Sequence, residues 1–330
     1  MINSTERIYK FDNMRGIAIF FIVLGHMLFV QKFHNVQLVH NFLYIIHLPI
    51  FFFVAGYFAK IGPDQPIKAF KRLIIPYLIF NIVYTFFSIA IGIPYGWKLF
   101  VVPTFALWFL IVLFFMKMAL PIYDRLKYPI IIAVILALFI GFIDFEPYFE
   151  IPRFFAFTPV FLIGFYYEDI KAKIQNSYPS IANIFSKKVI VVLIAVLVIL
   201  GCYLAVLQFP FKVIAMNSHY ANNFGFISRA VILFLGTAFA LLLHYFVSNR
   251  NTFITKIGQN SMAVYILHVY LVKIIYVNYK MLHINDGKVF MIFAVVASLA
   301  IVFILSRDFV TVAMNKLTDV VFNLLTKRVS

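Results

Sequence analysis

Arg15 and His26, two polar side chains of different chemistry, lie on one face of the first apolar segment of the chain. Eleven residues at about 100° each bring His26 back to within roughly 20° of Arg15 and about 16 Å further along a helix axis. We expect Arg15 at a membrane surface and His26 inside the membrane, where a titratable imidazole is costly and therefore indicates a function. A guanidinium at the mouth and an imidazole at depth suit a long anionic donor, which reaches the imidazole through a polar passage along this face.

Two further histidines, His47 and His268, fall within apolar segments. If the first span ends near residue 31 and the second begins near residue 41, His26 and His47 both lie roughly 7 Å below one surface. His268 is expected near the midplane, so the three imidazoles could line one cavity. Alternatively, each could simply form a hydrogen bond with a neighbouring helix. No metal site is expected, because no carboxylate lies at a matching depth and the spacing is not a known ligand pattern.

The elements that must hold these residues are membrane helices. The chain has 330 residues, of which 64% are hydrophobic and 12% charged, and its mean hydropathy is +0.99. Runs without a charge recur at a length near that needed to cross a hydrocarbon core of about 30 Å. These runs are continuously apolar and do not alternate, which excludes a transmembrane β-barrel. The composition therefore predicts an all-α, polytopic membrane helix bundle.

We expect about ten transmembrane helices in one domain that covers residues 1–330, with the bundle at 14–306. The expected spans are 14–31, 41–59, 73–93, 99–119, 128–143, 152–167, 188–208, 225–247, 258–279 and 287–306.

The distribution of positive charge predicts the orientation. Most of the 28 Lys and Arg residues fall in alternate connecting segments when the N-terminus is placed in the cytoplasm, so both termini are expected there. This topology explains the net charge of +16 without a nucleic-acid partner. Residues 308–326 read as an amphipathic helix on the inner membrane surface. The chain is therefore expected to be a multi-pass protein of the cell membrane, with lipids around it.

Several short motifs recur in a fixed order along the chain, and each of them alone is a weak signal. Together they resemble acyltransferase family 3, a family of integral membrane acyltransferases, in the branch similar to fucose O-acetylases. The motifs are FDNMRGIAIFFIVLGH (11–26), HLPIFFFVAGY (47–57), KAFKRLIIPY (68–77), ALWFL (106–110) and IGQNSMAVYILH (257–268).

This resemblance implies a catalytic site at His26, acting as a general base or as a transient acyl carrier, with Arg15 and His47 assisting. It also implies acyl-CoA as the donor, with acetyl-CoA the first choice and succinyl another. The coenzyme phosphates are expected near Arg15 and the basic loop, where Arg72 matches the second arginine of the family's RxxR motif and Ala69 replaces the first. The remaining expected donor contacts are Lys68, Lys71, Asn260 and Ser261, although topology explains the lysines equally well and the last two could cap a helix.

The acceptor is expected to approach from the other side of the membrane. Arg153 and Arg229 lie near span ends where topology does not call for cations, so we expect them, with Trp108 and His268, to bind a carbohydrate of the cell envelope or an exported glycan. Surface solvation is the alternative explanation. Further polar residues of this vestibule are Asp144, Glu146, Glu150, His219 and Asn222.

Two other classes of protein fit part of the pattern. A transporter or flippase of a glycan or glycolipid could use the histidines as a proton relay, but such proteins typically show repeated halves with broken helices, and the sequence shows no such repeat and no mid-span acid. A non-catalytic membrane scaffold would leave the buried histidines unexplained. The sequence therefore favours an enzyme that transfers an acyl group to a sugar hydroxyl.

Overall fold

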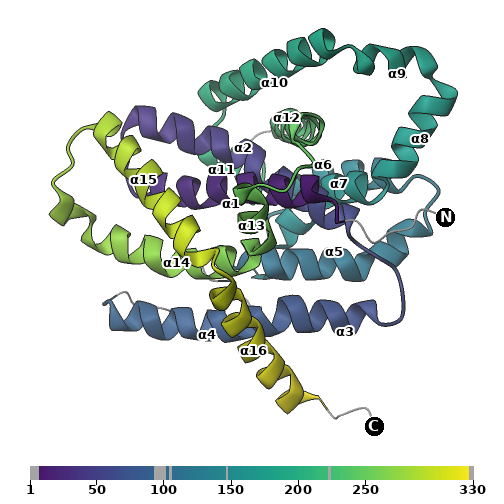
Figure 1. Ribbon diagram of the computed structural model, residues 1–330. Coiled ribbons are helices and arrows are strands. Elements are labelled where there is room, and N and C mark those ends of the chain that lie inside the picture. The colour runs from purple at the N-terminus through teal and green to yellow at the C-terminus, as the bar shows by residue number, and fades with distance from the viewer. Residues whose placement is uncertain (1–6, 93–101, 104–105, 146–147, 222–223, 327–330) are drawn as a thin grey trace.

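The computed structural model describes residues 7–92, 102–103, 106–145, 148–221 and 224–326, and helices are their only regular structure. Among these described residues, eight helices are long and apolar enough to cross a membrane, which agrees with the expected polytopic bundle (Figure 1). They are α1 (Tyr9–Leu28), α2 (His34–Tyr57), the continuous helix Gln65–Ala90, Tyr148–Phe165, α10 (Lys188–Gln208), α12 (Gly225–Phe246), α14 (Ser261–Asn278) and α15 (Gly287–Leu305).

The other helices are shorter or, in the case of α16 (Asp308–Leu325), less apolar. The span expected at 99–119 corresponds to α5 (Trp108–Asp124). The span expected at 128–143 corresponds to the apolar helix Pro129–Phe142, which is shorter than the eight above. The count of ten transmembrane helices therefore stays a prediction. The expected limits at residues 93 and 99 fall outside the described residues. The remaining elements are α6 (Pro129–Phe139), η2 (Ile140–Phe142), η3 (Tyr148–Glu150), α7 (Ile151–Phe165), α8 (Tyr167–Ser177), α9 (Pro179–Ser186), α11 (Phe211–Ile214), α13 (Phe253–Gln259), η4 (Tyr279–Leu282) and α16 (Asp308–Leu325).

Helices α1 and α2 form the centre of the bundle. Helix α1 packs against α2, α13, α14 and α15, and α2 also contacts α7, α10 and α12. In the apolar windows of α1 and α2, 78% and 67% of the residues are buried, compared with 28% in α10. The apolar residues that α10 exposes are therefore suited to contact lipid, whereas α1 carries its polar residues into the protein interior.

A close crossing holds α13 against the start of α1. A Cβ atom at Gly258 would collide with the backbone carbonyl of Asp12, and one at Gly16 would collide with that of Ile254. Small residues at a crossing allow helix backbones to approach closely in a membrane protein. Because α14 follows α13 directly, this crossing sets where the α14 side chains lie against α1.

The long helix Gln65–Ala90 contains a widened turn, η1 (Phe70–Ile74), between α3 (Gln65–Ala69) and α4 (Ile75–Ala90). Pro76 follows it, and a proline has no N–H for the carbonyl four residues earlier, at Arg72, and clashes with that carbonyl. A π turn relieves this conflict without ending the helix, and such turns are frequent at functional sites. The basic segment therefore lies on a distorted helical turn.

The N-terminal end of α1 and the start of α16 lie at the same end of the bundle. The Asn13 amide donates to the carbonyls of Ser248 and Arg250 after α12, and the Asn260 amide donates to the carbonyl of Ser306 before α16. We call this end the Arg15 end and the opposite one the His26 end. The expected C-terminal amphipathic helix is α16, which crosses α4 (Figure 1) and exposes Leu324; its position on the inner membrane surface stays a prediction.

Candidate active site

His26 is hydrogen-bonded to His268 in the interior of the bundle. His26 Nδ1 and His268 Nε2 are 2.7 Å apart, and the two side chains come from α1 and α14, which lie 242 residues apart in sequence. His26 is 7% exposed and His268 is fully buried. The structure thus brings together two of the three histidines expected to share a cavity.

The two imidazole rings meet edge to edge. Their centroids are 5.0 Å apart and the ring planes differ by 7°. With a nitrogen–nitrogen distance of 2.7 Å at that centroid separation, the two bonded nitrogens must lie between the ring centres. A hydrogen bond in the plane of both rings follows the direction of the acceptor lone pair, which is its most favourable geometry.

Helix α2 brings a third histidine and a tyrosine to the same region. His47 Nδ1 donates to the Leu43 carbonyl at 2.5 Å, so this ring is held by its own helix rather than by His26. The Tyr44 ring lies 6.4 Å from His26, 4.9 Å from His47 and 4.8 Å from His40, centroid to centroid. Tyr44 therefore neighbours both the histidine pair on α1 and α14 and the two histidines of α2.

His40 and Tyr44 were missed by the sequence reasoning, which began the second span at residue 41. The signal was present in the spacing, because His40, Tyr44 and His47 are four and three residues apart and so share one helix face. His40 is buried, and its Nε2 has no hydrogen-bond partner among the described residues. The polar lining of this end of the bundle is thus richer than the sequence reasoning expected.

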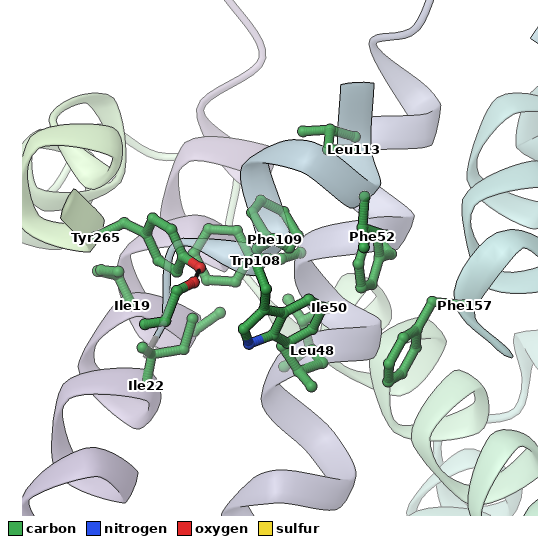
Figure 2. Packing of buried hydrophobic residues seen from close by; sticks show 14 of the residues in the cluster. Ile19, Ile22, Leu48, Ile50, Phe52, Trp108, Phe109, Leu113, Phe157 and Tyr265 are labelled. Carbon is green, nitrogen blue, oxygen red and sulfur yellow. Dashed lines mark hydrogen bonds between the residues drawn. The ribbon is translucent and has the colours of Figure 1, made fainter. Parts of the chain in front are cut away.

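The face of α1 between Arg15 and His26 is apolar. At about 100° per residue, Ile19 and Ile22 fall on the same face as both polar residues, and they are 0% and 2% exposed. Figure 2 shows them clustered with Tyr265 and Trp108. The α1 side of the passage that we expected to be polar is therefore lined by hydrocarbon, because the steps of four, three and four residues from Arg15 to His26 along this face place two isoleucines between them.

At the Arg15 end, Asp12 binds two arginines. The Arg15 guanidinium donates to one carboxylate oxygen of Asp12, and Arg7 Nε donates to the other at 2.7 Å. The carboxylate side chain is 3% exposed, and the hydrogen bond with Asp12 raises the pKa of Arg7. Sequence reasoning missed Asp12, although its spacing of three residues from Arg15 on a helix is typical of an ion pair.

Arg15 retains one unused donor. Its Nε is buried and has no hydrogen-bond partner among the described residues, and its guanidinium carbon lies 5.8 Å from the centroid of the Phe58 ring. Because a buried donor without a partner is unfavourable, this N–H marks a place where a ligand oxygen would be stabilised.

Two of the expected donor contacts instead hold α16. Lys71 Nζ lies 2.8 Å from Asp319 Oδ1 and 5.1 Å from the centroid of the Phe322 ring, both on α16. The Asn260 amide donates to the Ser306 carbonyl at 2.8 Å and to Asp308 Oδ1 at 3.0 Å. These contacts hold η1 and α13 against the C-terminal helix. They also occupy hydrogen-bond donors of Lys71 and Asn260 that could otherwise contact a coenzyme.

Asn260 and Ser261 lie far from His26. They begin α14, and His268 follows Ser261 by seven residues, which is about 10 Å along a helix axis. Since His268 is the residue that touches His26, neither side chain reaches a thioester held there. The expected capping role is also not observed, because no side chain caps the first turn of α14.

The last two basic residues of the expected donor site are exposed. Lys68 lies 3.5 Å from Asp64, an exposed pair of a kind that contributes little to stability. Arg72 is exposed on η1 and forms no ion pair with a carboxylate of the described residues. η1 packs against α5 and α16, whereas Arg15 lies on α1, so the basic residues are spread over the Arg15 end rather than gathered in one cluster.

At the His26 end, Arg153 joins Trp108 to Glu150. The Arg153 guanidinium lies over the Trp108 ring, 4.3 Å from its centroid, and Nη1 donates to Glu150 at 2.7 Å. Both charged side chains are largely buried, at 10% and 12% exposed. Because the cation covers the indole, that face of Trp108 cannot stack on a sugar while Arg153 remains there.

Arg229 fastens the loop after α11 to the bundle. It donates to the carbonyls of Ala137 and Ser218, at 3.2 and 2.8 Å, and its guanidinium lies over the Tyr220 ring. Arg153 also donates to this loop, at the Ala215 carbonyl. The two cations that seemed unexplained by topology thus have structural partners.

The other expected vestibule residues are only partly described. His219 lies 3.0 Å from Asp144 in an exposed pair, and Glu150 is the partner of Arg153. Glu146 and Asn222 lie outside the described residues. In the described part of the chain, no group of three His, Cys, Asp or Glu side chains could hold a metal ion.

Comparison with known protein families gives a match over most of the chain. A family model described as an acyltransferase domain, that of acyltransferase family 3, covers residues 8–307. The matched region begins at the Arg15 end of α1, includes the histidine pair and ends before α16. No curated protein and no solved structure matches the chain.

Proposed function

Because this chain belongs to acyltransferase family 3 and is thus a multi-pass membrane acyltransferase, we propose that it moves an acyl group from acyl-CoA to a hydroxyl of a carbohydrate. The acetyl group is the proposed cargo and the cell membrane the proposed location. The acceptor is a cell-envelope or exported glycan. The likeness to fucose O-acetylases stays a prediction, as do the roles of the individual residues.

The observation that carries this proposal is the buried imidazole of His26, held by His268 in the centre of the bundle. A histidine pair in the interior of a membrane protein is costly and indicates chemistry rather than packing alone. Histidine is also the side chain most often used to move a proton at neutral pH. His26 is therefore the proposed reacting residue.

The proposed step is direct transfer. The His26 imidazole takes the proton of the acceptor hydroxyl while that oxygen attacks the thioester carbonyl. The carbon–sulfur bond then breaks, and the leaving thiolate takes the proton back from His26, so the products are an ester and the free thiol. Proton transfer of this kind contributes about 10²–10⁴-fold to the rate. In the second version of the mechanism, His26 itself carries the acyl group between donor and acceptor.

The Arg15 end is the proposed entry for the donor. The unpartnered Nε–H of Arg15 supports this assignment, because a phosphate oxygen would satisfy it and guanidinium suits phosphate. Arg72 and Lys68 are exposed at the same end and offer further positive charge. Lys71, Asn260 and Ser261 hold or adjoin the C-terminal helix, so we assign them a supporting role in shaping the entry.

The pantetheine arm must pass the apolar wall formed by Ile19, Ile22 and Tyr265 to place its thioester at His26. Arg153 and Arg229 shape the opposite end by holding the loop after α11, and Trp108 supports Arg153. We therefore propose that the acceptor approaches near Tyr44 and His47, which adjoin His26.

The proposal is tested with purified protein in proteoliposomes, acetyl-CoA labelled in its acetyl group and a crude envelope glycan fraction as acceptor. Transfer of label to glycan by the wild type, lost in His26→Ala and in Arg15→Ala with membrane insertion unchanged, is the expected result. Movement of glycan that depends on a proton gradient and uses no acetyl-CoA would instead establish the transporter alternative.

A further inference from the structure

The hydrogen bond between His26 and His268 continues into the backbone of α14. His268 Nδ1 lies 3.0 Å from the carbonyl oxygen of Val264, one turn earlier in the same helix. The chain of contacts therefore runs from a carbonyl, through His268, to His26. A carbonyl oxygen can only accept a hydrogen bond. The Val264 carbonyl therefore determines which atom donates in each hydrogen bond of this series.

The direction follows atom by atom. The bond to the Val264 carbonyl requires a proton on His268 Nδ1, and a neutral imidazole with that proton has its lone pair on Nε2. His268 Nε2 then accepts, and His26 Nδ1 must donate. In neutral His26 the second nitrogen, Nε2, is consequently the unprotonated one.

We infer that His268 is a positioning residue, which fixes His26 in the tautomer whose basic lone pair is on Nε2 and so makes Nε2 the nitrogen that reacts. This inference rests on the proposed acyl transfer through His26. It assigns to His268 a role different from the contact with substrate that the sequence suggested. In the transfer step, the acceptor proton moves to His26 Nε2 and from there to the leaving thiolate, while the proton on Nδ1 stays in the bond to His268.

A second imidazole suits this position better than a carboxylate would. In many hydrolases a buried aspartate orients the catalytic histidine, but an isolated carboxylate is very costly to bury away from water. Within the described part of the chain, the histidine–carboxylate pair is His219 with Asp144, in an exposed loop, not at this site. A neutral imidazole orients His26 without leaving a net charge at the centre of the bundle between turnovers.

The test compares two substitutions of His268 in the full-length protein. His268→Leu keeps an apolar side chain of similar size but removes the acceptor. His268→Gln restores an acceptor oxygen near the former position of Nε2. We expect kcat for label transfer from acetyl-CoA to fall on the order of 10²-fold in the leucine variant, with KM for acetyl-CoA within about twofold, and we expect the glutamine variant to recover most of the loss.

The matched control is His244→Leu, which removes the part-buried hydrogen bond between a histidine and the Tyr167 hydroxyl at the other end of the bundle. Its kcat should stay near that of the wild type. In a His26→Ala background, His268→Leu should have no further effect, because His268 acts only through His26.

A direct readout of the tautomer is independent of activity and folding yield. The ¹⁵N spectrum of histidine-labelled wild-type protein in lipid nanodiscs should show His26 protonated at Nδ1 and unprotonated at Nε2. Protonation of Nε2 in the wild type, or an unchanged kcat in His268→Leu, would overturn the inference while leaving acyl transfer intact. A rise in KM with kcat spared would also overturn it, since that result identifies a substrate contact.

An inactive wild type would contradict the proposed function itself, so the two failures are distinguishable.

Discussion

The carboxylate of Asp12 is bound to the guanidinium of Arg15 one turn further along α1, and it binds Arg7 with its other oxygen. The arginine that sequence reasoning placed at the mouth without a carboxylate partner is therefore part of a network with one negative and two positive charges. The network orients the Arg15 side chain and leaves a net positive charge for an anionic donor.

Replacing Asp12 with alanine should destabilise the protein by about 1–3 kcal/mol, because two arginines lose their shared, buried acceptor. The two guanidinium groups are partly exposed, so water limits the cost. Thermal unfolding in detergent measures it. The matched control is Asp64→Ala, which removes an exposed partner of Lys68 and should change stability by less than about 0.5 kcal/mol.

The crossing of α1 and α13 gives a second prediction. Gly258→Ala should cost about 1–3 kcal/mol, since the added methyl group meets the Asp12 carbonyl and the backbone must shift. Gly25→Ala is the control, because its Cβ would lie 4.0 Å from the Leu43 Cβ, an ordinary contact. At this helical position, replacing glycine with alanine should stabilise the fold slightly or leave its stability unchanged. Equal losses in the two variants would contradict the close crossing.

Arg153 and Glu150 test whether the charges of the His26 end are structural. Arg153→Met should destabilise the protein by about 3–5 kcal/mol, because it leaves the Glu150 carboxylate largely buried and unpaired. The double variant Arg153→Met with Glu150→Gln should recover part of this loss. Chemical denaturation of the wild type, the two single variants and the double variant provides the cycle, and an additive result would argue against coupling of the two side chains.

The attachment of α16 should depend on pH. The hydrogen bonds from Lys256 and Asn260 lower the pKa of Asp308 below its ordinary value of 3.8. Because the pKa is lower in the folded state, the contact stabilises the attachment fully above that value and is lost as the pH falls through the lowered pKa. The protection factors of the α16 amides against hydrogen exchange should therefore fall below about pH 4 in the wild type. In Asp308→Asn, exchange should already be raised at neutral pH, with a smaller further change on acidification.

Sequence reasoning predicted the helical membrane fold, because charge-free apolar runs of spanning length leave few other solutions. It also singled out Arg15, His26 and His268 as candidate site residues, since the spacing and the depth of a residue can be read from the apolar run in which it lies. It could not show that His26 meets His268 rather than His47, because that contact depends on how α14 packs against α1, 242 residues away.

The differences between the expected site and the structure have physical origins. Cations were assigned to ligands where no partner was visible in the neighbouring sequence, and the structure supplies partners from distant segments, Asp319 for Lys71 and the carbonyl of Ser218 for Arg229. The expected polar lining of the passage is not observed on α1 for another reason. A helix face that holds two polar residues eleven positions apart also holds residues between them, here Ile19 and Ile22.

The central claim is that His26 performs acyl transfer, and the most direct measurement is the release of free thiol from acetyl-CoA by purified protein with a glycan acceptor. His26→Ala should lower this rate by at least about 10²-fold, while the variant unfolds at a temperature close to that of the wild type. Thiol release at the wild-type rate by a folded His26→Ala protein would contradict the account.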